Sequence, residues 1–454
     1  MATKIETNDD EDFSSCPVPE SGRMGRLSLT MAWWALCSAM FWLMVPATLA
    51  LTLGTKNVLI GLALSTAAYA LINAAITRFS IRTGLSVAQF SQIVFGKIGA
   101  QLATLLFFAT AIYYVVFEGS VIAVAINAYY PIVDMNLAYL IVVCYSVPLV
   151  FGSVQHWLDK FNGVLLPFYL IGLGAAVVMT LGEYGYSDAW LNLGPANGAP
   201  ADGWWHCFTY FMGVWIVMMY TWDYARFGRK EDSTYHAKIN FGWVFYAFTF
   251  MVNAIVGIFI AGTIPLEGGI NEVSAVLGLL KLMGFVGLAF VWVSQTRINT
   301  ASFYLASVNM QMFFKSTLKL NLPKFIWAVV VGAIVYFLML QNVFTFILQA
   351  LSYQGTFVVA WVAIALVQIY LSRNANANAA HLTARIERAP IAKWRALGVW
   401  VLASATGICL IQAQGVYASW SAPATALIAA AGYALVARRE PVLSVNGKLS
   451  AVAE

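Results

Sequence analysis

The residues best equipped for chemistry lie in one polar stretch of an otherwise apolar sequence. Its members are Ser294, Gln295, Thr296, Arg297, Asn299, Thr300 and Ser302. In a membrane, an unpaired polar group costs several kcal/mol, so these side chains must face a cavity, a partner helix or a ligand. An arginine at membrane depth is by default a functional-site candidate. The alternative, a span that ends near Arg297 with its guanidinium at the interface, is disfavoured by the apolar sequence on both sides.

A second candidate is Glu118, one helical turn after Tyr114 and on the same helix face. A carboxylate at membrane depth is costly and usually marks a substrate, ion or proton pathway. Because burial disfavours the charged form, such a group can carry a proton. A structural glutamate bonded to a neighbouring helix is the less favoured alternative. Tyr114 is suited to stacking on a flat ligand, although most aromatic side chains in membrane helices only pack.

The composition places these candidates in a membrane domain. Of 454 residues, 61% are hydrophobic and 10% charged, whereas soluble domains carry about 25% charged residues. A membrane span needs about 20 mostly apolar residues, and this rule predicts about twelve transmembrane helices. The candidate segments are 27–53, 58–76, 98–128, 137–151, 164–181, 204–220, 241–261, 282–308, 326–339, 343–371, 396–411 and 418–436.

The loops between these segments predict the orientation. Alternate loops collect lysine and arginine, as at Arg226, Arg229 and Lys230, while the others carry acids such as Asp134 and Asp188. Excess basic charge marks the cytoplasmic side, so we expect both termini in the cytoplasm and the protein in the cytoplasmic (inner) membrane. The predicted organisation is a disordered cytoplasmic tail (1–26), a membrane core (27–373), a cytoplasmic linker (374–395), two further helices (396–438) and a cytoplasmic tail (439–454).

Two residues that disturb helices fall in corresponding places. Pro46 lies in the first segment and Gly213 in the sixth, just before Trp215. Each alone is best explained as a kink or a packing glycine. Paired interruptions, however, indicate an inverted-repeat transporter whose site lies at the broken helices. The repeats would be residues 27–183 and 204–373, with the last two helices appended.

Other function classes find little support in the sequence. The net charge of +5 is modest and indicates no nucleic-acid partner. The five cysteines and four histidines have no metal-ligand spacing. The sequence contains no phosphate-binding loop, nucleophile elbow or zinc-protease motif, so ATP-driven transport and enzymatic activity are disfavoured. A channel would need a continuous polar lining, yet the polar groups cluster near mid-span. No obligate protein partner is indicated, and we expect no cofactor besides a coupling ion.

Several short motifs carry a resemblance to a known family. They are Ser38-Ala39-Met40-Phe41-Trp42, Arg82-Thr83-Gly84-Leu85-Ser86, Phe95-Gly96, Asp223-Tyr224-Ala225-Arg226-Phe227-Gly228-Arg229 and the region from Asn299 to Tyr304. Over residues 27–373 the chain resembles the nucleobase–cation symporter (purine–cytosine permease) family, which includes cytosine and hydantoin transporters. The resemblance implies a five-plus-five inverted repeat of the leucine-transporter type, two extra helices and alternating access.

The resemblance also implies a binding site for a flat heterocycle. In this family the ring is held between aromatic residues of the third and sixth spans, which here correspond to Tyr114 and to Val214 or Trp215; we choose Trp215. Polar groups of the third and eighth spans contact the ring edge. Here they are Glu118 and either Asn299 or Gln295. Aromatic faces and mixed donor and acceptor groups suit such a ligand.

The coupling ion is a separate question. Family members that use sodium bind it between main-chain carbonyls of the first span, here near Ala35 to Ser38, and hydroxyls of the eighth, here Ser294 and Thr296. Arg297 lies beside these hydroxyls. We therefore hypothesise that Arg297 takes the place of sodium and that Glu118 carries a coupling proton. The rival is ordinary sodium coupling, with Arg297 packed against the fifth span.

Together these features predict a secondary active transporter, a cation symporter that imports a purine, pyrimidine or related nitrogen heterocycle. The alternative is an amine or amino-acid transporter of the same fold, because Glu118 offers a charge partner for an amine.

Overall fold

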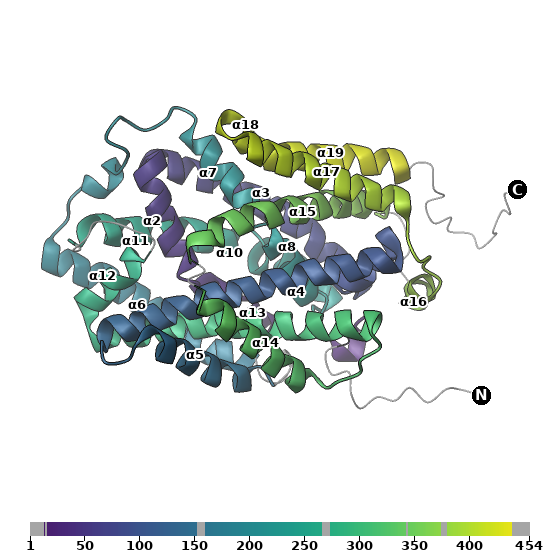
Figure 1. Cartoon of the computed structure of the whole chain (residues 1–454), viewed down its shortest axis with the longest axis horizontal. Helices are drawn as coiled ribbons and strands as arrows, with labels where there is room; N and C mark the ends of the chain where they lie inside the picture. The colour runs from purple at the N-terminus through teal and green to yellow at the C-terminus, as the bar shows by residue number, and fades with distance from the viewer. Residues whose placement is uncertain are drawn as a thin grey trace, which may run out of the picture.

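The computed structural model describes residue 13 and residues 16–151, 159–265, 273–341, 344–373 and 379–437. Helices dominate these residues, and no β-strand forms among them (Figure 1). Within these described ranges, seven helical segments are long and apolar enough to cross a membrane. The predicted tail residues 1–12 and 14–15, linker residues 374–378 and the tail 439–454 lie outside the described part of the chain.

Every predicted hydrophobic segment coincides with a helix or with a broken helix. Two of the helices are broken, the first within residues 26–53 and the second within residues 203–225. After the first broken helix come α3 (Thr55–Thr83), α4 (Val87–Tyr129), α5 (Met135–Leu149) and α6 (Asp159–Tyr184). After the second come α10 (Trp243–Tyr246), α11 (Asn253–Thr263), α12 (Ser274–Met283), α13 (Phe285–Thr317), α14 (Lys324–Met339), α15 (Phe344–Leu371), α16 (Ala379–Glu387), α17 (Trp394–Ala413), α18 (Gly415–Ser419) and α19 (Ser421–Ala437). The count of membrane crossings and the repeat itself stay predictions.

The long helices α4 and α13 pack along each other in the middle of the bundle. The last helices, α17 and α19, pack against each other and against α15, and Figure 1 shows them along one edge of the molecule. The bundle is therefore built around α4 and α13, which carry most of the predicted site residues, while α17 and α19 pack mainly against each other and against α15.

The first helix is broken, but not at the predicted residue. It consists of α1 (Arg26–Trp33), a short 3-10 turn at Leu36–Ser38 and α2 (Phe41–Leu53). Pro46 lies inside α2, so its prediction as the break is wrong. The helix opens upstream because distant side chains there satisfy the freed main-chain groups. The Asn253 amide donates to the Cys37 carbonyl at 2.7 Å, for example.

The sixth segment is broken where the sequence predicts. It consists of α7 (Gly203–Met212) and α8 (Ile216–Ala225), separated by the turn at Gly213. A Cβ placed on Gly355 of α15 would lie 3.0 Å from the Gly213 Cα. The glycines thus allow two backbones to approach closely at the break.

Residues 16–26 do not form the predicted disordered tail. Val18 and Met24 are buried, and the Val18 amide donates to the Gly84 carbonyl at 2.9 Å. The Arg23 Nη1 donates to the carbonyls of Ile81, Arg226 and Gly228 at 2.7–2.9 Å. The sequence did not predict this ordered segment, because polar composition does not show which carbonyl groups at the ends of distant helices lack a hydrogen-bond donor.

We expect Arg23→Ala to lower the free energy of unfolding by about 2 kcal/mol, because hydrogen bonds from a charged donor contribute about that much. Thermal melting of the purified protein measures the effect. Arg78→Ala is the matched control, since Arg78 is exposed on α3. Equal melting of both variants would show that the Arg23 contacts contribute nothing to stability.

Candidate functional site

The central feature is a buried polar bridge between three helical segments. The Gln295 Nε2 of α13 donates to the Glu118 Oε2 of α4 at 2.5 Å, and the Gln295 Oε1 accepts from the Met40 amide at 2.7 Å. Glu118 and Gln295 are at most 1% exposed. The bridge thus joins Glu118 and Gln295, one of the two α13 residues predicted to contact the ring edge, to the break of the first helix.

The first break is also fastened to α13 by two serines. The Ser38 hydroxyl donates to the Ser294 carbonyl at 3.0 Å and to the Ala35 carbonyl at 2.8 Å. The Ser294 hydroxyl in turn donates to the Ser38 carbonyl. The predicted ion-site residues Ala35, Ser38 and Ser294 therefore do lie together, and their groups are bonded to one another.

Arg297 is completely buried beside the same break. Its Nη2 donates to the Trp34 carbonyl at 2.8 Å, and its guanidinium lies close to the Cys37 thiol. The guanidinium carbon is 5.9 Å from the centre of the Tyr169 ring of α6. Among the described residues, no carboxylate forms an ion pair with it. A fixed positive charge thus touches both the opened main chain and the fifth predicted span.

The next turns of α13 contact α5. The Thr296 hydroxyl is 2.9 Å from the Tyr145 hydroxyl, and the Asn299 Nδ2 donates to the Ser146 hydroxyl at 3.0 Å. The Asn299 Oδ1 is buried and has no hydrogen-bond partner in the described part of the chain. Thr296 is therefore engaged, while Asn299 keeps one acceptor unused.

Unsatisfied polar atoms gather near Glu118. The hydroxyl of Tyr114 is buried without a hydrogen-bond partner among the described residues, and its ring meets Phe41 edge-on at 6.4 Å. The Tyr220 hydroxyl of α8 interacts electrostatically with Tyr114 and Glu118, and it lies beside the Ser302 hydroxyl. Buried polar groups in proteins nearly always have partners. A polar ligand between α4, α8 and α13 would supply them.

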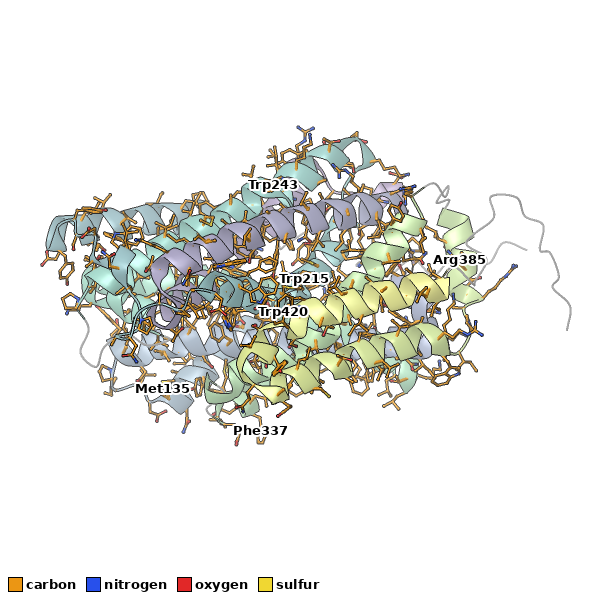
Figure 2. The ribbon with its side chains drawn as sticks, turned by 90° about the horizontal axis from the view of Figure 1, so that it is seen from above. Met135, Trp215, Trp243, Phe337, Arg385 and Trp420 are labelled. Carbon is orange, nitrogen blue, oxygen red and sulfur yellow. The ribbon has the colours of Figure 1, made fainter. Side chains whose placement is uncertain are left out.

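Trp215 lines a cavity to which none of the residues of this cluster belongs. It follows the break of the sixth segment and is 6% exposed, and the cavity, of about 490 Å³, is also lined by Leu366 of α15 and Ala430 of α19. Among the described residues its ring contacts no other aromatic ring. Figure 2 labels Trp215 in the middle of the molecule. The structure thus assembles all the predicted site residues around one region except Trp215.

Four further residues of this region were not predicted as site residues from the sequence: Tyr220, Ser302, Asn253 and Tyr169. The Tyr169 hydroxyl donates to the Asn253 Oδ1 at 2.7 Å, and the Asn253 Nδ2 donates to the Cys37 carbonyl at 2.7 Å. Ser302 belongs to the polar stretch, so its spacing could have indicated a role. Tyr220 is one of 21 tyrosines, and nothing in its local sequence distinguishes it.

The fold is shared with solved transporter structures. The chain is similar to Mhp1, a nucleobase-cation-symport-1 family transporter, in a closed conformation with bromovinylhydantoin bound: the TM-score is 0.75 at 16% identity, covering 95% of this chain and 97% of that chain. It is also similar to the inward-facing conformation of Mhp1, with a TM-score of 0.74, 15% identity and 95% of each chain covered. A substrate-bound, outward-open Na⁺-coupled sialic acid symporter gives a TM-score of 0.55 at 11% identity, covering 94% of this chain and 92% of that chain.

These likenesses confirm the predicted fold class, an all-helical membrane protein of the kind seen in Mhp1. The chain is a multi-pass membrane protein, and the solved structures that share its fold are transporters rather than enzymes. No protein-family model and no curated protein gives a significant match to the sequence.

Proposed function

We propose that this protein is a secondary active transporter, a cation symporter that imports a purine, pyrimidine or related nitrogen heterocycle by alternating access. The observation that carries the proposal is the buried bridge from Glu118 through Gln295 to the Met40 amide. It sets a carboxyl group, an amide and an opened helix side by side at the centre of a transporter fold. Such groups can pair with the mixed donor and acceptor edge of a heterocycle.

In the proposed complex, Tyr114 stacks on one face of the ring. Glu118 contacts the ring edge, joined by the unused Oδ1 of Asn299 and by Gln295, which holds Glu118 in place. Apolar surroundings strengthen each of these hydrogen bonds. A buried donor or acceptor left unpaired by the wrong ligand costs about 1–3 kcal/mol, which provides selectivity among related rings.

For coupling, we propose that Arg297 supplies the fixed charge that sodium would otherwise bring and that Glu118 carries a proton. Two contacts support this assignment. The guanidinium donates to the Trp34 carbonyl, and the Ser294 hydroxyl and Ser38 carbonyl are bonded to each other. The rival is sodium bound between these groups and Thr296, with Arg297 packed against Tyr169.

We place the protein in the cytoplasmic membrane with both termini inside, from the basic residues of alternate loops. The proposed organisation follows the predicted one: core 27–373, linker 374–395, helices within 396–438 and tails at either end. Small-molecule substrate and lipid bilayer are the proposed partners.

The second aromatic residue of the site is open to a direct test. Tyr220 lies near Tyr114 and Glu118, whereas Trp215 lines a cavity with α15 and α19. We expect Tyr220→Ala to weaken heterocycle binding about tenfold through loss of ring stacking, Tyr220→Phe to preserve binding within a few-fold, and Trp215→Ala to have little effect. Equilibrium binding to the purified protein measures this, and the reverse order would restore Trp215 as the stacking residue.

An amine or amino acid is the other substrate class, favoured by the buried carboxyl of Glu118. A binding screen of purines, pyrimidines, hydantoins, amines and amino acids against the purified protein, with and without sodium at two pH values, separates the classes. The proposal requires saturable binding of a heterocycle. Binding confined to amines or amino acids would replace it.

A further inference from the structure

A basic pocket lies at the end of the molecule where α16 packs beside the start of α4. Its volume is about 260 Å³. Arg385, Arg388 and Lys393 line it together with Ile93, Ala389 and Pro390. Figure 1 shows α16 at this end of the bundle, and Figure 2 labels Arg385 there. This pocket is remote from Glu118 and takes no part in the function proposed above.

Basic residues outnumber acids in the segment that carries the two arginines of this pocket. Residues 379–395 contain Arg385, Arg388, Lys393 and Arg395 but a single acid, Glu387. Among the described residues, no carboxylate forms an ion pair with Arg385 or Arg388. Burial lowers the pKa of the Arg385 guanidinium, which reflects the cost of removing a charge from water. A bound anion would offset that cost.

The wall of the pocket is firmly held against α4. The Lys97 amide donates to the Pro390 carbonyl at 3.0 Å, and the Lys393 amide donates to the Phe95 carbonyl at 2.9 Å. The Gln92 Nε2 donates to the Ile386 carbonyl at 2.9 Å. Gly96 adopts a φ of +83°, and a Cβ there would lie 2.8 Å from the Pro390 oxygen. The basic side chains therefore project from a backbone whose position is fixed.

The neighbouring surface indicates where the anion comes from. Ile391 and Trp394 are 72% and 71% exposed next to the pocket. Trp394 begins α17, which is long and apolar enough to cross a membrane. Tryptophan favours the membrane–water interface, and basic pockets between transmembrane helices bind phospholipid head groups. The pocket thus lies at the level of lipid phosphates.

We propose that this pocket binds a phosphate group, presented by an anionic phospholipid. The two guanidinium groups suit the phosphate oxygens, because arginine donates paired hydrogen bonds to them. Ile391 and Trp394 would contact the acyl chains. Since the wall of the pocket is bonded to α4, which also carries Tyr114 and Glu118, an occupied pocket would stabilise the start of that helix.

The test is native mass spectrometry of the full-length protein in detergent, titrated with dioctanoyl phosphatidic acid or with the phosphatidylcholine of the same chain length. We expect phosphatidic acid to bind more tightly. The double variant Arg385→Ala/Arg388→Ala should weaken that binding about tenfold or more, as expected for lost charge-assisted hydrogen bonds. Inorganic phosphate, titrated by calorimetry, is the second arm.

Lys238→Ala/Lys315→Ala is the matched control, because it removes two exposed charges elsewhere. Arg388→Ala alone, at an exposed position, serves if the double variant does not fold. Phosphate binding that depends on the arginines, with no preference for phosphatidic acid, would retain the phosphate site and refute the lipid source. If neither ligand binds the wild type, or if the arginine variants bind like the control, the proposal is overturned.

Discussion

Replacing Glu118 by alanine is expected to weaken heterocycle binding about ten- to a hundredfold and to abolish measurable uptake. The substitution removes the carboxyl proposed to contact the ring edge. It also removes the shorter of the two hydrogen bonds of the Gln295 Nε2, which keeps only the Glu118 main-chain carbonyl at 3.2 Å as its acceptor. A polar group of the ligand left unpaired in the buried site costs about 1–3 kcal/mol, and about 1.4 kcal/mol is a factor of ten in affinity. Equilibrium binding and uptake into proteoliposomes measure the two effects.

Glu118→Gln separates recognition from coupling. The amide keeps the shape of the side chain and can still hydrogen-bond to Gln295 and the ligand, but it cannot carry a proton. We expect binding to remain within a few-fold of wild type while accumulation against a gradient is lost. Glu183→Ala is the control, since Glu183 is exposed at the end of α6. Normal binding and uptake by Glu118→Ala would refute its role.

Replacing Arg297 by methionine is expected to lower the rate of coupled uptake at least about tenfold without lowering the stability of the protein. The guanidinium is fully buried, and among the described residues it has no acidic partner. Apolar replacement of buried charges is often neutral or stabilising by about 1–4 kcal/mol. A charged side chain at membrane depth is costly and usually marks a functional site. Thermal melting and uptake, measured on the same preparation, test both halves.

Arg297→Lys is the matched control because it keeps the positive charge. We expect it to preserve part of the uptake, although an ammonium group cannot reproduce the planar guanidinium at the Trp34 carbonyl. If Arg297→Met melts far below the wild type, Arg297 serves packing against Tyr169 instead. Sodium-dependent uptake gained by Arg297→Met would strengthen the assignment further.

The fold was predictable because hydrophobic length alone identifies membrane helices. The break at Gly213 was also predictable, since the glycine itself allows the close approach to Gly355. The first break was not. It depends on Gln295, Ser294 and Asn253, which lie more than 200 residues away in the chain, so the local signal of Pro46 misled.

The site was predictable only in part. The helical spacing of Tyr114 and Glu118 and the polar run with Gln295 and Arg297 singled out residues that do form buried contacts. Gln295 bonds to Glu118, and Arg297 bonds to the Trp34 carbonyl. Which aromatic ring faces Tyr114 depends on how α8 turns after its break. A one-residue change of phase rotates a helical side chain by about a quarter turn. The assignment of Trp215 as the stacking residue therefore stays a prediction, and Tyr220, further along the same segment, is its rival.

Uptake of a radiolabelled heterocycle into proteoliposomes, under either an imposed proton gradient or an imposed sodium gradient, tests the central claim most directly. Wild-type protein should accumulate the heterocycle that binds in the screen, saturably, when the lumen is alkaline. Accumulation should be equal in sodium and potassium buffers, and a protonophore should abolish it. Sodium-driven uptake that ignores the proton gradient would contradict the roles of Arg297 and Glu118 in coupling. Absence of saturable uptake of any purine, pyrimidine or hydantoin would contradict the proposed function itself.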